Sequence, residues 1–147
     1  MSQDSYQVRF DWGHAGAAAA GQDADVVVWV SQLAGVAGPD HVDGAPVLRG
    51  SLEQAAELAS WSLARQTELG GRLRVAVIAA GVERPDGTLR FAVEDLLAAG
   101  AIIEAISDAG IDHQSPEAAA AASAYRGLRG AMRHLMSASE TARESRS

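Results

Sequence analysis

The sequence contains no cysteine and no lysine, and these two absences exclude several kinds of chemistry. Thiol catalysis, disulfide bonds and cysteine-ligated metal centres all require cysteine. Schiff-base catalysis and the phosphate-binding P-loop require lysine, whereas all 12 basic residues of this chain are arginine. We therefore exclude enzymes of these classes.

Long apolar runs and a basic charge balance are also missing. No apolar run approaches the roughly 20 residues that span a bilayer, and residues 1–13 lack the basic and apolar regions of a secretory signal. The net charge of -7 disfavours binding to a phosphate backbone. We therefore expect a cytoplasmic protein that binds neither nucleic acid nor membrane.

The apolar residues that are present favour one α/β domain. The length of 147 residues fits a single domain. Residues 25–30 and 73–80 form continuous apolar runs, which are typical of parallel strands buried on both faces. We predict that these two strands are adjacent and parallel, that residues 1–136 form the domain, and that residues 137–147 form a polar C-terminal tail that frays.

The other predicted elements alternate between strands and helices. Residues 6–12 alternate as a strand, residues 13–21 favour a short helix, and residues 31–50 form a loop with a possible edge strand at residues 46–48. Ser51 and Gln54 fit a capping box at the start of the next helix. Two further helices are predicted, from residue 91 or 93 to 109 and from Ser115 to about Met136. The pattern favours a three-layer α/β/α fold with a small, mostly parallel sheet.

The segment 73–101 carries the best candidate site, because ligands of open α/β sheets bind where strands end and helices begin. Glu94 and Asp95 open its helix. As a functional site, these carboxylates would be catalytic and would hold Mg²⁺ together with water and substrate oxygens. As a structural feature, they would only stabilise the positive end of the helix dipole, by about 0.3–1 kcal/mol each.

Three charged residues near the intervening turn, and one after the first strand, are the candidate ligand-binding residues. Arg84 and Arg90 bracket the turn and could fork onto a phosphate, sulfonate or carboxylate, with Glu83 beside them. Asp11 follows the first predicted strand. Each of these side chains also has a simpler interpretation, as a solvated loop charge or, for Asp11, a turn or cap residue.

Three segments in the same order resemble the 2-phosphosulfolactate phosphatase family, especially its actinobacterial members. They are Val-Arg-Phe-Asp-Trp-Gly at residues 8–13 with the strand that follows, the segment 75–103 with its Pro-Asp-Gly-Thr-Leu-Arg turn and Glu-Asp-Leu-Leu-Ala-Ala-Gly-Ala helix, and Ser-Pro-Glu-Ala-Ala-Ala at residues 115–120. The resemblance implies a three-layer α/β/α fold, dependence on Mg²⁺ and hydrolysis of a small phosphorylated sulfonic or hydroxy acid.

The chain also departs from the family pattern. Ser31 stands where the family has an aspartate after the second strand, and Val82 separates Gly81 from the Glu-Arg pair that follows it in the family. The family's asparagine-glycine and leucine-arginine-asparagine motifs are missing between Val30 and Ser51. Near the C-terminus, Ser-Ala-Ser-Glu-Thr at residues 137–141 stands where a cysteine and a Ser-Gly-Arg-Glu-Leu pattern are expected. The resemblance is therefore to an internally shortened relative with a degenerate site.

These observations leave three hypotheses open. The first is a shortened homologue that has weak or no activity and binds a small phosphorylated or sulfonated anion. The second is an active Mg²⁺-dependent phosphatase, and the third is a non-catalytic oligomerisation domain. In each case we expect a homodimer, because a shortened α/β domain should leave apolar surface uncovered. The side chains expected to contribute to that surface are Trp29, Leu58, Trp61, Leu128, Met132, Leu135 and Met136.

Overall fold

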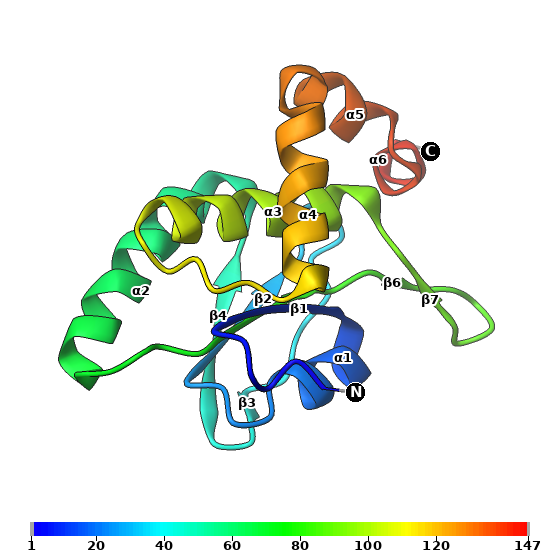
Figure 1. The fold of residues 1–147 in the computed structure, drawn as a ribbon. Coiled ribbons are helices and arrows are strands. Elements are labelled where there is room, and N and C mark those ends of the chain that lie inside the picture. The colour runs from blue at the N-terminus through cyan, green and yellow to red at the C-terminus, as the bar shows by residue number, and fades with distance from the viewer. Residues whose placement is uncertain (1, 147) are drawn as a thin grey trace.

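A five-stranded sheet forms the centre of the protein (Figure 1), as seen in a computed structural model that describes residues 2–146. Its strands are β1 (Val8–Trp12), β2 (Val26–Val30), β3 (His41–Val42), β4 (Ala45–Gly50) and β5 (Val75–Ala79). They lie in the order β1-β5-β2-β4-β3. All neighbours are parallel except β3, which pairs antiparallel with β4.

The two continuous apolar runs form adjacent central strands, as the sequence predicts. β2 and β5 are parallel, and Val28 lies opposite Val77. Every residue of both strands is buried, because helices or loops cover both faces of the sheet. Such strands need no polar face, which explains their unbroken apolar sequence.

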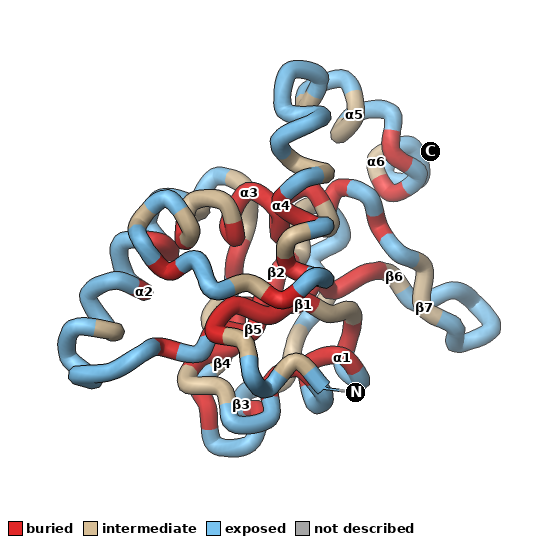
Figure 2. The backbone as a smooth tube through the Cα atoms, in the orientation of Figure 1, coloured by how far each residue is buried: buried red, intermediate tan, exposed pale blue. Residues whose placement is uncertain are grey.

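Helices lie on both faces of the sheet and build two separate cores, which confirms the predicted α/β fold class (Figures 1 and 2). The helices concerned are α1 (Gly13–Ala20) on one face and α2 (Ala55–Leu69), α3 (Val93–Asp108) and α4 (Pro116–Leu128) on the other. Val28 and Val77 pack with Ile102 of α3. On the opposite face, Ile78 packs with Ala17 of α1.

Two local signals place α4 against α3. Ser115 caps α4, since its hydroxyl accepts a hydrogen bond from the Ala118 N–H at 3.1 Å, as the Ser-Pro-Glu start predicts. Gly100 lies on α3 where it meets α4, and a Cβ at this position would collide with the Ala121 carbonyl. The missing side chain therefore allows the two helices to approach closely.

The segment 31–50 is more ordered than its composition predicts. It contains β3 and the six-residue β4, and β4 is an inner strand that pairs on both sides rather than an edge strand. Pro46 lies near the start of β4, and the ladder with β2 begins at Val47. The proline therefore precedes the positions that need an N–H donor for that ladder.

Two predicted helix boundaries are wrong. The capping box does not form, because the Ser51 hydroxyl donates to the Gln54 side chain and caps no backbone N–H. A short 3₁₀ turn, η1 (Leu52–Gln54), precedes α2. The helix that starts after Ser115 ends at Leu128, and η2 (Arg129–Ala131) and α5 (Met132–Ala138) follow it. Gly127 and Gly130 flank the break, and glycine is a poor helix former.

Two smaller elements lie outside the layers. β6 (Val82–Glu83) and β7 (Leu89–Arg90) form a hairpin around the predicted turn. Within residues 137–147, expected as a fraying tail, residues 140–145 instead form α6 (Glu140–Ser145), which is capped by the Ser139 hydroxyl. Among the described helices, none is long and apolar enough to cross a membrane.

Candidate functional site

Asp95 connects the carboxyl ends of two neighbouring strands. The four parallel strands all end at the same edge of the sheet, where α3 begins. Asp95 Oδ1 accepts a hydrogen bond from the Gln32 N–H at 2.7 Å, just after β2. Asp95 Oδ2 accepts one from the Gly81 N–H at 3.0 Å, just after β5. The carboxylate therefore fixes the two loops that leave the central strands.

The buried position of Asp95 changes its titration. Only 1% of the residue is exposed, and loss of solvent raises the pKa of its carboxyl from 3.8 to about 6. The neighbouring charge of Glu94 also raises this pKa, whereas the two N–H donors and the positive charge of Arg90 lower it. Asp95 can therefore exchange a proton near neutral pH, as a catalytic or metal-binding carboxyl often does.

Glu94 is the least satisfied polar group at this edge. It is 1% exposed, and neither of its carboxylate oxygens has a hydrogen-bond partner among the described residues. A buried carboxylate without a partner is costly, and buried charges are normally paired. Glu94 lies in the first turn of α3, just before Asp95. The helix dipole favours a negative charge there, but it offsets only part of the cost of burying the carboxylate.

Gln32 extends the network toward β4 and was not among the residues singled out in the sequence. Its side-chain carbonyl accepts the Leu52 N–H at 2.7 Å, and its amide nitrogen donates to both Glu53 carboxylate oxygens at 3.1 Å. A hydrogen bond from its own backbone N–H, followed by that from Gln32, lowers the pKa of Glu53. The only signal in the sequence is that Gln32 is the second residue after a buried strand.

Ser31 has a structural role at the same edge. Its hydroxyl accepts a hydrogen bond from the Val36 N–H at 2.9 Å and so closes the loop that follows β2. A hydroxyl engaged in this way supplies no negative charge for a metal ion.

Of the two candidate arginines, Arg90 is the one whose charge acts on this edge, and its side chain is already paired with residues of α6. Its Nε donates to Glu140 at 2.7 Å, and its Nη2 donates to the Thr141 hydroxyl at 3.0 Å and to Glu144 at 3.3 Å. The Arg90 side chain is only 12% exposed. Its positive charge nevertheless affects Asp95, so Arg90, Glu94 and Asp95 form one electrostatic group.

Glu83 and Arg84 lie on the exposed part of the hairpin. Arg84 Nη1 donates to the Leu89 carbonyl at 3.0 Å, which uses part of its guanidinium within the hairpin itself. Gly13 and Gly81 both pack against Leu89, and a Cβ on Gly81 would be 2.6 Å from that side chain. The base of the hairpin therefore lies over the ends of β1 and β5, whereas Glu83 and Arg84 are exposed to solvent.

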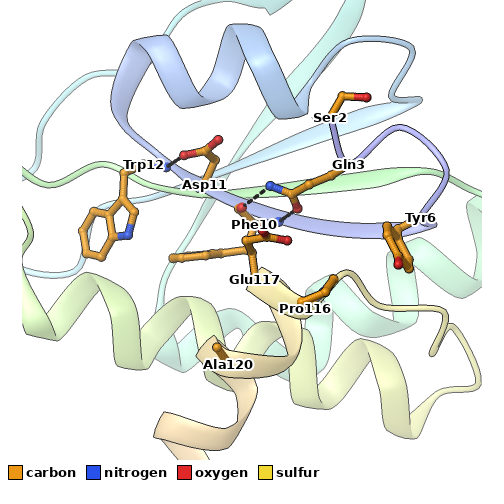
Figure 3. A pocket seen from close by; sticks show the side chains of 9 residues that line it. All are labelled: Ser2, Gln3, Tyr6, Phe10, Asp11, Trp12, Pro116, Glu117 and Ala120. Carbon is orange, nitrogen blue, oxygen red and sulfur yellow. Dashed lines mark hydrogen bonds between the residues drawn. The ribbon is translucent and has the colours of Figure 1, made fainter.

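Asp11 lies near the end of β1 and lines a cavity. Its Oδ1 accepts the Trp12 N–H at 2.8 Å. The cavity, of about 560 Å³, lies between the N-terminal segment, β1 and the start of α4. Figure 3 shows Asp11 on the α1 side of the strand, opposite Glu117. The structure thus groups Glu94 with Asp95, places Arg90 near them, and puts Asp11 apart from them, beside the cavity at β1.

The two carboxylates fit Mg²⁺ only with help from other ligands. Within residues 2–146, no three His, Cys, Asp or Glu side chains are grouped so that they could hold a metal ion. Glu94 has two unpartnered oxygens, and each Asp95 oxygen accepts one hydrogen bond. Mg²⁺ commonly uses one or two carboxylates and completes its octahedron with water and phosphate oxygens, so the unpartnered oxygens of Glu94 are the donors that could serve such an ion.

Comparison with known proteins adds no assignment, because no protein-family model and no curated protein matches this chain. The interpretation of the site therefore depends on its own geometry.

Proposed function

We propose that the carboxyl edge around Glu94 and Asp95 binds Mg²⁺ and, together with it, a small phosphorylated or sulfonated acid, with weak or no hydrolysis. The observation that carries this proposal is Glu94, whose two buried carboxylate oxygens have no partner among the described residues. A divalent cation is the group that best matches two adjacent buried carboxylates. The resemblance to the 2-phosphosulfolactate phosphatase family, whose helix includes this Glu-Asp pair, supports the same choice.

The anion would depend on the metal ion more than on arginine. Glu94, Asp95 and Glu53 make this edge acidic, and acidic side chains repel a phosphate unless a cation lies between them. Arg90 is paired with Glu140 and Glu144. When bound, Mg²⁺ would neutralise the phosphoryl oxygens, while Glu94 would ligate it and Asp95 would hold the strand ends in place.

Weak hydrolysis follows from Ser31. The loop hydrogen bond of its hydroxyl supports a structural role at the position where the family has a carboxylate. Loss of one positioned polar group in an active site typically costs about 10²–10³ in rate.

The proposal includes a cytoplasmic location, which the lack of cysteine favours.

Calorimetric titration with Mg²⁺ tests the binding site directly. We expect saturable binding with a Kd of about 1 mM or lower, and about tenfold or weaker binding in Glu94→Gln, because one charged ligand is lost. Glu94→Gln should fold at least as well as the wild type without metal, since it removes an unpartnered buried charge. The control is Glu57→Gln, an exposed acid on α2, which should bind Mg²⁺ like the wild type. No binding, or equal binding by Glu94→Gln, would refute the metal site.

Phosphate release separates the weakly active protein from an active phosphatase. With 2-phosphosulfolactate or phospholactate and Mg²⁺, we expect little or no release by the wild type. Ser31→Asp, which adds a carboxylate beside Gln32 and can still accept the Val36 N–H, should bind Mg²⁺ more tightly. Robust Mg²⁺-dependent release by the wild type would overturn the weak-activity proposal in favour of the active enzyme.

A further inference from the structure

The cavity beside β1 has a chemistry opposite to that of an anion site. It is lined by the N-terminal segment, β1 and the first turn of α4. Among the described residues that line it, Asp11 and Glu117 are acidic and none is basic. Its volume of about 560 Å³ is within the range of small-molecule pockets. A negatively charged ligand would therefore find no positive side chain in this cavity.

Aromatic rings form much of the cavity wall. Tyr6, Phe10 and Trp12 all line it. Trp12 is held in place by Phe91, since the two rings stack with their centroids 4.4 Å apart and their planes at 10°, and by the edge of Phe10 at 5.8 Å. The wall is thus aromatic, and ring contacts position Trp12. Faces of aromatic rings attract organic cations, most strongly where water is partly excluded.

Two polar groups of the cavity are unused within the protein. The Gln3 amide is fully engaged with the free edge of β1, because it donates to the Phe10 carbonyl at 2.8 Å and accepts the Phe10 N–H at 3.0 Å. In contrast, the Glu117 carboxylate and the Tyr6 hydroxyl make no hydrogen bond within residues 2–146. Figure 3 shows Glu117 rising from α4 toward β1, with the Trp12 and Tyr6 rings on either side.

From this combination we infer that the cavity between β1 and α4 binds a small organic cation that carries N–H donors and an apolar stem. The ammonium or guanidinium group donates to Glu117 and the Tyr6 hydroxyl, and the stem lies along Phe10 and Trp12. Asp11 adds negative charge from the margin of the cavity without a direct contact. This site is separate from the Glu94–Asp95 edge, and its ligand has the opposite charge, so it does not depend on the function proposed there.

Three probes of the same shape and different charge test the inference: phenethylammonium, 2-phenylethanol and phenylacetate. Each is titrated into the full chain while the indole N–H resonance of Trp12, assigned with Trp12→Phe, is followed by NMR. We expect the cation to bind about tenfold or more tightly than the alcohol, and the anion to show no saturable binding. Equal affinity for the cation and the alcohol would refute a cation site.

Variants identify the group that recognises the charge. Glu117→Gln should weaken binding of phenethylammonium about tenfold and leave binding of 2-phenylethanol unchanged, because only the charged probe uses the carboxylate. Glu57→Gln on α2 also removes one negative charge, at a position far from Glu117 in the sequence, and it should bind all probes like the wild type. Since Glu117 is exposed at a helix start, its variant should remain folded, which circular dichroism verifies. Unchanged affinity in Glu117→Gln would overturn the assignment.

Discussion

At the scale of single residues, Asp95 has a pH dependence with a definite sign. Its pKa is about 6 in the folded protein against 3.8 as the ordinary value. The folded state therefore binds this proton more tightly than the unfolded state. The stabilisation is complete below about pH 4, is lost as the pH rises through about 6, and amounts to about 3 kcal/mol for a difference of roughly two pH units.

We expect this contribution to disappear in Asp95→Asn. Asparagine keeps one acceptor for the Gln32 or Gly81 N–H and loses the other, which costs about 1–3 kcal/mol of unfolding free energy, and this cost does not itself vary with pH. The pH-dependent part is absent because the amide does not titrate. Urea unfolding of both proteins between about pH 4 and about pH 8 measures both effects as a difference in the free energy of unfolding. The other carboxylates contribute equally to the wild type and the variant, so their contributions cancel in this difference. Parallel curves for the wild type and Asp95→Asn would contradict the raised pKa, and Asp40→Asn, an exposed loop acid, is the control.

The sequence singled out Glu94 and Asp95 by their position but did not describe their surroundings. Both acids open a helix after a buried strand, which is a general feature of α/β sites. The partner Gln32 lies 63 residues away from Asp95, and apart from its place shortly after a buried strand, nothing in the nearby sequence distinguishes it from an ordinary loop glutamine. Likewise, Glu94 lacks a partner because of the way α3 packs, and no local sequence pattern indicates this.

At the scale of elements, the segment formed by α5 and α6 is held to the α/β layers through Arg90. It projects from the layered body in Figure 1. Glu140, Glu144 and Thr141, all on α6, are the Arg90 partners. Because the Arg90 side chain is largely buried while both glutamates are exposed, these ion pairs are stronger than pairs between two exposed side chains, although solvent still screens them.

We predict that Arg90→Met releases α6 while the sheet stays intact. Backbone amides of residues 139–146 should exchange with solvent about tenfold faster, which corresponds to the loss of about 1.4 kcal/mol of local stability. Hydrogen exchange followed by mass spectrometry provides the measurement, and amides of β2 and β5 should keep their protection. Arg84→Met removes an arginine from the same hairpin, and it should leave α6 unchanged. Equal protection of α6 in the wild type and in Arg90→Met would show that other contacts hold this helix.

The helices and strands differ in how well the local sequence predicts them. β2 and β5 were predictable because five consecutive apolar residues in each strand leave no polar face. β4 was not, because its central position depends on pairing with β2, whereas Pro46 and the nearby glycines favour a loop. The residues of α6 are polar, and their helix depends on the Ser139 cap and on Arg90, which is about 50 residues earlier in the chain.

At the scale of the whole molecule, apolar side chains remain exposed, although not all of those expected. Trp29 and Leu58 are buried within the chain, so they are unavailable to a partner. Trp61, Leu63 and Leu69 on α2 are 37%, 42% and 42% exposed. Three large apolar side chains on one exposed helix favour contact with another protein surface more than single scattered residues do.

We predict a twofold homodimer that uses α2. Association of identical chains most often closes as a pair, and burial of Trp61 and Leu69 in the interface would remove their contact with water. Multi-angle light scattering at about 50 µM should give twice the chain mass of 15.2 kDa, and Trp61→Gln should shift the protein toward the monomer, since aromatic side chains often dominate interface energies. Phe91→Gln, at a large apolar position outside α2 that is 64% exposed, should keep the dimer mass. A wild-type mass of 15.2 kDa would show that the chain is a monomer, and a dimer unaffected by Trp61→Gln would place the interface elsewhere.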